Sequence, residues 1–268
     1  MSGAKLKTLV IAALVLLNLF FAALIAQAKI SETAQYRATE TKLAQVLGQS
    51  GISVVCRIPV AARFRAYDLQ RDAYAEARFA ATLLGECAET ETDGAARFEN
   101  DSGAIEFGTS GEFDARLRGW TVARGTERAT AEKLLKKLKI DYTAITEYTE
   151  SGYATLYAGL DFGGAVVNAG VAFEFADGEL MRVSGRKIFR ADETGGAEYY
   201  DAATLLTAFA AAVARGDFRC TEVRAVTVAY RARSDAFPGA NLEPGLAVTA
   251  DTGRWFINAA DGTAEPAE

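Results

Sequence analysis

The amino-acid sequence predicts an α+β protein in which one N-terminal transmembrane helix precedes two small extracytoplasmic domains, each with helices on an antiparallel sheet. Three observations favour this class. An apolar run near the start is long enough to cross a membrane. Segments with apolar residues at helical spacing then alternate with segments of period two. Glycine-containing turns separate the alternating segments, as expected for antiparallel hairpins.

The apolar run covers residues 9–26 and contains one polar side chain, that of Asn18. About 20 apolar residues cross a hydrocarbon core of roughly 30 Å. Lys5 and Lys7 precede the run, and basic residues stay on the cytoplasmic side, so the remaining chain is expected outside the cell membrane. The residues expected to contact lipid or a partner helix are Leu9, Leu14, Leu17, Asn18, Phe20, Phe21 and Leu24.

A cleaved signal peptide is the alternative to an anchor, because Ala26, Gln27 and Ala28 fit a small-x-small cleavage site. The length of the run favours the anchor, since signal peptides have apolar regions of about 7–15 residues. Asn18 either bonds to a neighbouring helix or satisfies its amide on its own backbone, and the residues alone leave both open.

The predicted organisation is a cytoplasmic start (1–8), a membrane helix (9–28), a first domain (29–122) and a second domain (123–268). The two domains are predicted to be related halves that meet near residues 119–125. The elements expected in the first domain are a helix at 30–47 ended by Gly48, a strand at 52–55, a helix from a cap at Asp68 to Leu84, a loop at 89–94, and strands at 97–107 and 112–117 joined by a turn at 108–111.

The second domain is expected to begin with a helix from Thr126 or Thr130 to Leu138. Strands follow at 155–162, 171–175 and 181–183, and a three-residue loop at 176–178 would pair Phe173 with Met181. Asp201 caps the most regular helix, which Gly216 ends. A strand at 226–230, a hairpin of 246–248 with 255–257, and a frayed tail at 264–268 complete the chain.

Composition excludes several classes of function. The chain has a net charge of −6, which disfavours nucleic-acid binding because phosphate contacts need a basic surface. Histidine is absent, so catalytic triads and metal sites that depend on it are excluded. Cys56, Cys87 and Cys220 are too few and too widely spaced for a disulfide framework, although one pair is compatible with the sequence. No cofactor-binding motif, metal site or catalytic constellation is present, and we expect a protein that is not an enzyme.

Two stretches resemble the YycI and YycH regulatory proteins of Gram-positive bacteria. The first is Lys5-Leu6-Lys7-Thr8 leading into Leu16-Leu17-Asn18-Leu19-Phe20. The second is the closing stretch 251–262, where Trp255-Phe256 precedes Asn258-Ala259 and the turn residue Gly262. The resemblance implies a bitopic membrane protein with two extracytoplasmic α+β domains. Its implied partners are a membrane sensor histidine kinase that controls cell-wall homeostasis and a paralogous regulatory protein.

The function expected is therefore that of a membrane-anchored accessory protein that regulates a two-component sensor kinase and needs no cofactor. The first alternative is an exported PepSY-like domain that binds a peptide or inhibits a protease. The second is an exported hydrolase that uses carboxylates alone, which requires two acids facing each other about 5–10 Å apart.

Overall fold

The computed structural model describes residues 3–92, 95–233 and 240–267, and its described side chains exclude those of residues 3–13, Leu16 and Thr92. The helices are α1 (Gly3–Gln49), α2 (Ala73–Leu84), α3 (Glu127–Leu138) and α4 (Ala202–Arg215). The strands before α3 are β1 (Ser53–Val54), β2 (Ala66–Gln70), β3 (Ala88–Thr92), β4 (Ala95–Asn100), β5 (Gly103–Phe107) and β6 (Glu112–Leu117). The later strands are β7 (Tyr142–Glu150), β8 (Tyr153–Phe162), β9 (Ala165–Ala176), β10 (Glu179–Arg186), β11 (Arg190–Thr194), β12 (Glu222–Arg233), β13 (Asn241–Ala250), β14 (Gly253–Asn258) and β15 (Ala264–Pro266).

The order of these elements contains one motif three times within the described chain: a helix followed by a meander of four antiparallel strands. The motif comprises α2 with β3–β6, α3 with β7–β10, and α4 with β12–β15. The sequence analysis predicted a different grouping, two related halves that each contain two helices and their strands, with α4 and its strands in the second half. The protein is a mixed α+β fold with one large connected sheet.

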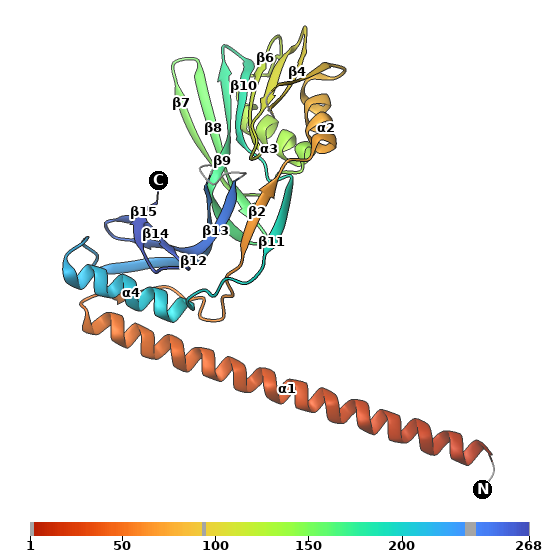
Figure 1. Ribbon diagram of the computed structural model, residues 1–268, viewed down its shortest axis with the longest axis vertical. Helices are drawn as coiled ribbons and strands as arrows, with labels where there is room; N and C mark the ends of the chain where they lie inside the picture. Colours follow the sequence, from red (N-terminus) through yellow and green to blue (C-terminus); the bar gives the residue numbers. More distant parts are fainter. Residues whose placement is uncertain (1–2, 93–94, 234–239, 268) are drawn as a thin grey trace.

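The first two motifs form one continuous sheet because their last strands, β6 and β10, pair antiparallel. The resulting strand order is β7-β8-β9-β10-β6-β5-β4-β3. Helices α2 and α3 cover the same face of this sheet (Figure 1), and their apolar side chains complete its core, as Phe79 and Leu135 show. None of the four described helices lies on the opposite face (Figure 1).

The third motif has its own core. Residues of α4, β12, β13 and β14 bury apolar side chains together with Leu43 and Leu47 from the C-terminal end of α1. The two parts of the sheet join where β12 runs parallel to β9, at Ala229 beside Val166. Buried residues from both sides of position 122, such as Leu117 and Ala131, belong to one core cluster. The observed cores group the residues differently from the predicted division into 29–122 and 123–268. That division stays a prediction.

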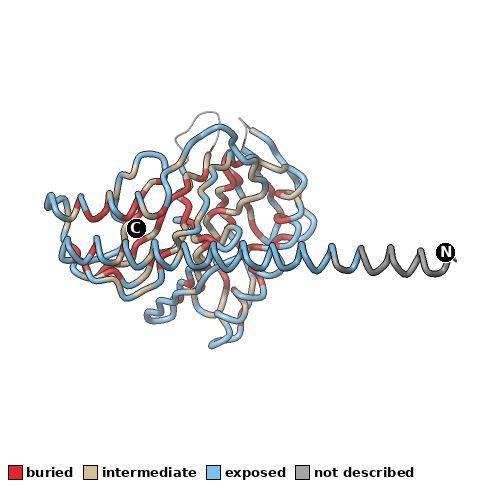
Figure 2. Tube along the Cα trace, turned by 90° about the horizontal axis from the view of Figure 1, so that it is seen from below, coloured by how far each residue is buried: buried red, intermediate tan, exposed pale blue. Residues whose placement is uncertain are grey.

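Helix α1 is continuous, so the predicted anchor and the helix predicted at 30–47 are one element. Its C-terminal end lies beside α4, and the rest extends away from the other elements (Figures 1 and 2). Within the described part of the chain, no helix combines enough length and apolar character to cross a membrane. The first residues of the predicted span, 9–13, have side chains that lie outside the described part of the chain.

Several element boundaries differ from the prediction. Asp68 lies in β2, and the cap of α2 is Asp72, whose carboxylate accepts a bond from the Ala75 amide at 2.9 Å. The predicted loop at 89–94 is replaced by β3 over its described residues, and the expected strand at 97–107 is a hairpin of β4 and β5. The tail at 264–268 is not frayed over its described residues, because β15 pairs with β14.

The turn between β9 and β10 was also predicted wrongly. Ala176 pairs with Glu179 across a two-residue turn in which Asp177 and Gly178 both have positive φ, of 51° and 83°. Such turns suit the right-handed twist of a hairpin. A bulge at Met181 then shifts the register, so that Phe173 pairs with Val183 and the two buried side chains share a face.

Other predicted elements are confirmed. Helix α4 begins after Asp201, whose carboxylate accepts from the Thr204 amide at 2.7 Å, and ends at Gly216 with φ of 85°. Helix α3 follows Thr126, which makes no side-chain capping bond. The hairpin of β13 and β14 pairs Leu246 with Ile257, as the sequence suggested.

Candidate ligand-binding cleft

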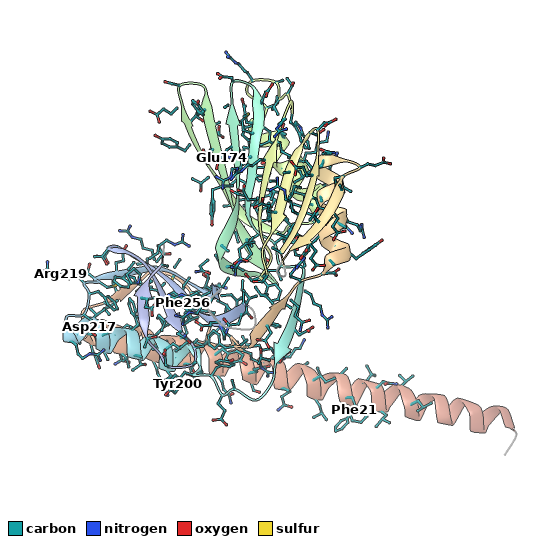
Figure 3. The ribbon with its side chains drawn as sticks, turned by 45° about the horizontal axis from the view of Figure 1, so that its top comes forward. Phe21, Glu174, Tyr200, Asp217, Arg219 and Phe256 are labelled. Atoms are coloured by element: carbon teal, nitrogen blue, oxygen red, sulfur yellow. The ribbon has the colours of Figure 1, made fainter. Side chains whose placement is uncertain are left out.

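A cleft of about 540 Å³ lies where the two parts of the sheet meet. One wall comes from β7, β8 and β9, and the other from β12 to β15. Both walls are sheet faces that none of the helices α1 to α4 covers (Figures 1 and 3). Its size lies within the roughly 300–1,000 Å³ typical of ligand pockets. Its lining includes the side chains of Tyr157, Asn168, Arg231, Arg233, Arg254, Phe256 and Glu265.

On the first wall, the ring of Tyr157 from β8 lies over Gly170 of β9. A Cβ atom at Gly170 would be 2.3 Å from Cζ of Tyr157, so glycine is required for the ring to lie flat on the sheet. Tyr157 remains 46% exposed towards the cleft. Burial of the remainder raises the pKa of its phenol, so the hydroxyl stays protonated at neutral pH and can donate a hydrogen bond.

The geometry of β9 creates the cleft. Gly159 of β8 pairs with Gly170 of β9, and the register shifts between Gly159 and Asp161, which bends the pair. On the N-terminal side of this bend, Val166 and Val167 pair with β12, while Val166 also stays paired with Asp161 of β8. The Oδ1 atom of Asn168 accepts a bond of 2.7 Å from the Ala232 amide, which extends the connection between β9 and β12.

The second wall repeats the combination of an aromatic ring and a glycine. Phe256 of β14 lies over Gly245 of β13, where a Cβ atom would be 2.6 Å from Cζ of Phe256. The guanidinium of Arg231 lies 4.5 Å from the centre of the Phe256 ring, within cation–π range. Arg231 also forms an ion pair with Glu265 of β15, so its side chain is fixed from two sides.

The cleft is basic although the chain is acidic. Its lining contains three arginines and one carboxylate, that of Glu265. Arg233 forms an ion pair with Glu243 at 3.4 Å. Arg254 is exposed and makes no ion pair with any described residue. The lining therefore favours a ligand that carries negative charge.

Strand β7 contributes an unpaired edge. Among the described strands it pairs only with β8, and Thr143, Ala144 and Thr146 of β7 line the cleft. The free N–H and C=O groups of an edge strand can pair with an added peptide strand. A ligand in extended conformation could thus form backbone hydrogen bonds with β7 while its side chains contact the cleft.

The described residues contain no group of three or more cysteine, aspartate or glutamate side chains positioned to hold a metal ion. Because Glu265 is the single carboxylate in the lining and is paired with Arg231, the cleft gives no support to the hydrolase alternative. The chemistry available is recognition by charge, by aromatic faces and by a strand edge.

The residues predicted from sequence as a partner surface lie elsewhere, on α1. Those with described side chains are exposed: Leu14, Leu17, Asn18, Phe20, Phe21 and Leu24. Figure 3 shows Phe21 on the part of α1 that extends away from the cleft residue Phe256. Asn18 donates to the Leu14 carbonyl at 3.0 Å, so one of its two N–H groups is satisfied within its own helix. The side chains of Lys5, Lys7 and Leu9 lie outside the described residues.

Sequence reasoning did not identify the cleft. The one available signal was the pair of adjacent aromatic residues Trp255 and Phe256 in the closing hairpin, from which only a strand and a family resemblance were predicted. Cys56, Cys87 and Cys220, considered for a pairing, are all free. Burial raises the pKa of the Cys220 thiol to about 11, so it is an unreactive part of the core.

Comparisons with known proteins found similar solved structures but no matching family. No family model matches the chain, and no curated protein matches it. An uncharacterised protein from Eubacterium rectale is similar with a TM-score of 0.44 and 9% identity, over 76% of this chain and 85% of that one. The C-terminal domain of YpeB from Bacillus megaterium is similar with a TM-score of 0.38 and 13% identity, over 75% of this chain and 99% of that one. The resemblance to YycI and YycH stays a prediction.

Proposed function

We propose that this chain is a membrane-tethered, extracytoplasmic binding protein without catalytic activity, and that its cleft holds an extended, acidic segment of a partner polypeptide. The observation that carries the proposal is the juxtaposition of a free strand edge, β7, with a cleft that has three arginines and one carboxylate in its lining. This function corresponds to the peptide-binding alternative drawn from the sequence.

An extended peptide fits the cleft better than a compact small molecule does. The cleft is open along β7, whose backbone can add a strand, and specificity in such complexes comes from pockets for alternate side chains. Arg254 is available for a carboxylate of the ligand, and Tyr157, which is 46% exposed, offers apolar surface in the same cleft. Arginine suits this role because its planar guanidinium binds carboxylates through two parallel hydrogen bonds.

The tether is proposed on the sequence of α1. Residues 9–26 are apolar apart from Asn18, and Lys5 and Lys7 precede them. The apolar side chains described in this region are largely exposed, for example Phe20 at 58% and Leu19 at 61%. Large apolar side chains exposed together on a helix mark a surface that lipid or protein covers.

The proposal is tested with the full-length chain in detergent and synthetic decapeptide libraries in acidic, neutral and basic pools. We expect retention of the acidic pool, measured by mass spectrometry after capture. Ala247→Trp fills the cleft from β13, and Arg254→Glu reverses its charge; each is expected to weaken binding at least tenfold. Ala81→Trp, on the exposed face of α2, is the matched control and should bind as the unaltered chain does.

Equal retention of all three pools, or binding by Ala247→Trp equal to that of Ala81→Trp, would show that the cleft is not the binding site. Circular dichroism of each variant establishes that the fold is intact before binding is compared.

Regulation of a membrane sensor histidine kinase is a second candidate, favoured by the separation of the apolar part of α1 from the cleft. In this case the cleft would bind the extracytoplasmic part of the kinase or of a paralogous regulator, and α1 would pack beside its membrane helices. Capture from solubilised membranes with a C-terminal tag tests it. Asn18→Leu should reduce recovery of the kinase and Gln27→Leu should not; recovery of no membrane partner with either chain would reject it.

A further inference from the structure

A second, smaller hollow lies between α2 and the C-terminal end of α3, on the helical side of the eight-stranded part of the sheet. Its volume is about 120 Å³, less than a third of the cleft's 540 Å³. Arg78 comes from α2, Lys137 and Lys139 from the end of α3, and Lys187 from the segment after β10. The lining contains four cations and no carboxylate.

The fold brings these cations together for identifiable reasons. Ala75, Arg78, Phe79 and Thr82 follow one stripe of α2, at spacings of three and four residues. Lys139 ends α3 in the left-handed conformation, with φ of 53°. Lys187 follows Arg186 at the end of β10, and its amide donates to the Gly111 carbonyl at 2.8 Å, which fixes its position.

Lys187 is the central group of the hollow. Its Nζ atom donates to the Leu138 carbonyl at the end of α3 and lies 5.5 Å from the Phe79 ring and 5.2 Å from the Phe189 ring. Burial, with the charges of Lys139 and Arg78 nearby, lowers the pKa of Lys187 to about 8. An ammonium group has three donors, so two remain beyond the bond to Leu138.

The cluster is unusual for this protein. Most described arginines at sheet surfaces form ion pairs, for example Arg182 with Asp114 at 2.7 Å and Arg97 with Glu99 at 2.9 Å. Arg78, Lys137, Lys139 and Lys187 form no ion pair with any described residue. Four cations around one hollow repel each other, and a bound anion would relieve that repulsion.

We infer that this hollow binds a tetrahedral oxyanion of the phosphate type, held by Lys187 and Arg78 with Lys137 and Lys139 at its rim. The hollow is smaller than the roughly 300–1,000 Å³ that drug-sized ligands need, which suits a single anionic group. Lysine and arginine form short, charge-assisted bonds to phosphate oxygens. The anion comes from free phosphate or from the headgroup of a phospholipid, and both present the same chemistry.

A purely structural role explains only part of the arrangement. A cation at the C-terminal end of α3 is favourable because of the helix dipole, and this accounts for the contact of Lys187 with Leu138. It does not account for Arg78, which comes from the middle of α2 and raises the repulsion around Lys187.

The first test measures thermal unfolding of the full chain in detergent, in sodium phosphate and in sodium chloride at equal ionic strength. Phosphate should raise the unfolding temperature of the unaltered chain and of Lys133→Met, a control on the exposed side of α3. Lys187→Met keeps the apolar contacts with Phe79 and Phe189, and Arg78→Met changes an exposed residue; each should weaken phosphate binding at least tenfold. An equal phosphate effect in all four chains would overturn the inference.

The second test identifies the source of the anion through acylation of Lys187, followed by mass spectrometry. Bound anion favours the charged ammonium and so slows acylation. The chain is compared in nanodiscs of phosphatidylcholine, with and without 10 mM phosphate, and in nanodiscs containing phosphatidylglycerol. Slowing by phosphate in neutral discs supports a free oxyanion, and slowing in anionic discs without phosphate supports a lipid headgroup. An unchanged rate in every disc contradicts the site.

Discussion

Replacement of Gly170 by alanine is the most informative test of the sheet that forms the cleft. A Cβ atom there would be 2.3 Å from Cζ and 2.4 Å from Oη of Tyr157, and 2.6 Å from the carbonyl oxygen of Ala158. The Tyr157 ring can rotate away because it is 46% exposed. The Ala158 carbonyl belongs to β8 and can move only if the β8–β9 pairing moves with it.

The expected loss of stability for Gly170→Ala is about 1–3 kcal/mol, the range for an added methyl group in a packed site. For a domain of this size each kcal/mol lowers the unfolding temperature by roughly 2–4 °C. Thermal unfolding followed by circular dichroism measures the shift. Gly195→Ala is the matched control, because its Cβ would meet nothing within 4 Å.

A double-mutant cycle separates the two contacts. Tyr157→Ala with Gly170→Ala should recover the part of the loss that comes from the ring and leave the part that comes from the Ala158 carbonyl. If Gly170→Ala unfolds at the same temperature as Gly195→Ala, the packing described for this wall of the cleft is incorrect.

Two further predictions concern charged groups. The Glu76 carboxylate is 0% exposed and accepts bonds of 3.0 and 2.6 Å from Arg71, and Arg71→Met removes this partner. We expect the free energy of unfolding, measured in urea, to fall by about 3–5 kcal/mol. A fall below about 1 kcal/mol would contradict the role of the pair. Asp251 accepts from the Thr221 hydroxyl at 2.7 Å and from two amides, which lowers its pKa to about 2. Because the folded pKa is lowered, its contribution to stability is present above about pH 4 and is lost as the pH falls through 2. Asp251→Asn should flatten the dependence of the urea midpoint on pH between 2 and 5, and an unchanged slope would argue against these bonds.

The sequence predicted those elements whose signals are local. Helix α4 was located correctly because Asp201 caps it, Gly216 ends it, and apolar residues recur every four positions between them at Leu205, Phe209 and Val213. The hairpin of β13 and β14 was located because two short apolar runs, 246–248 and 255–257, flank a turn at Asp251 and Gly253. In both cases the determining residues lie within one element or its immediate ends.

Other features depend on contacts that no local pattern records. Strand β7 was not predicted, because as an edge strand it exposes most of its side chains and shows no regular apolar alternation. The register of β10 depends on a bulge at Met181, which periodicity alone cannot place. The cleft requires β9 to meet β12, more than 50 residues later, and its aromatic rings lie over glycines from neighbouring strands.

Hydrogen exchange of the full chain, with and without the tightest-binding acidic decapeptide from the library, is the decisive test of peptide binding in the cleft. If the peptide adds a strand to β7 and occupies the cleft, amides in residues 142–150 should exchange more slowly, together with those near Arg254 and Phe256. Amides of α2 and β3 should be unaffected and serve as an internal reference. Slower exchange confined to α1 or α2, with β7 unchanged, would contradict the account of the cleft as the ligand site.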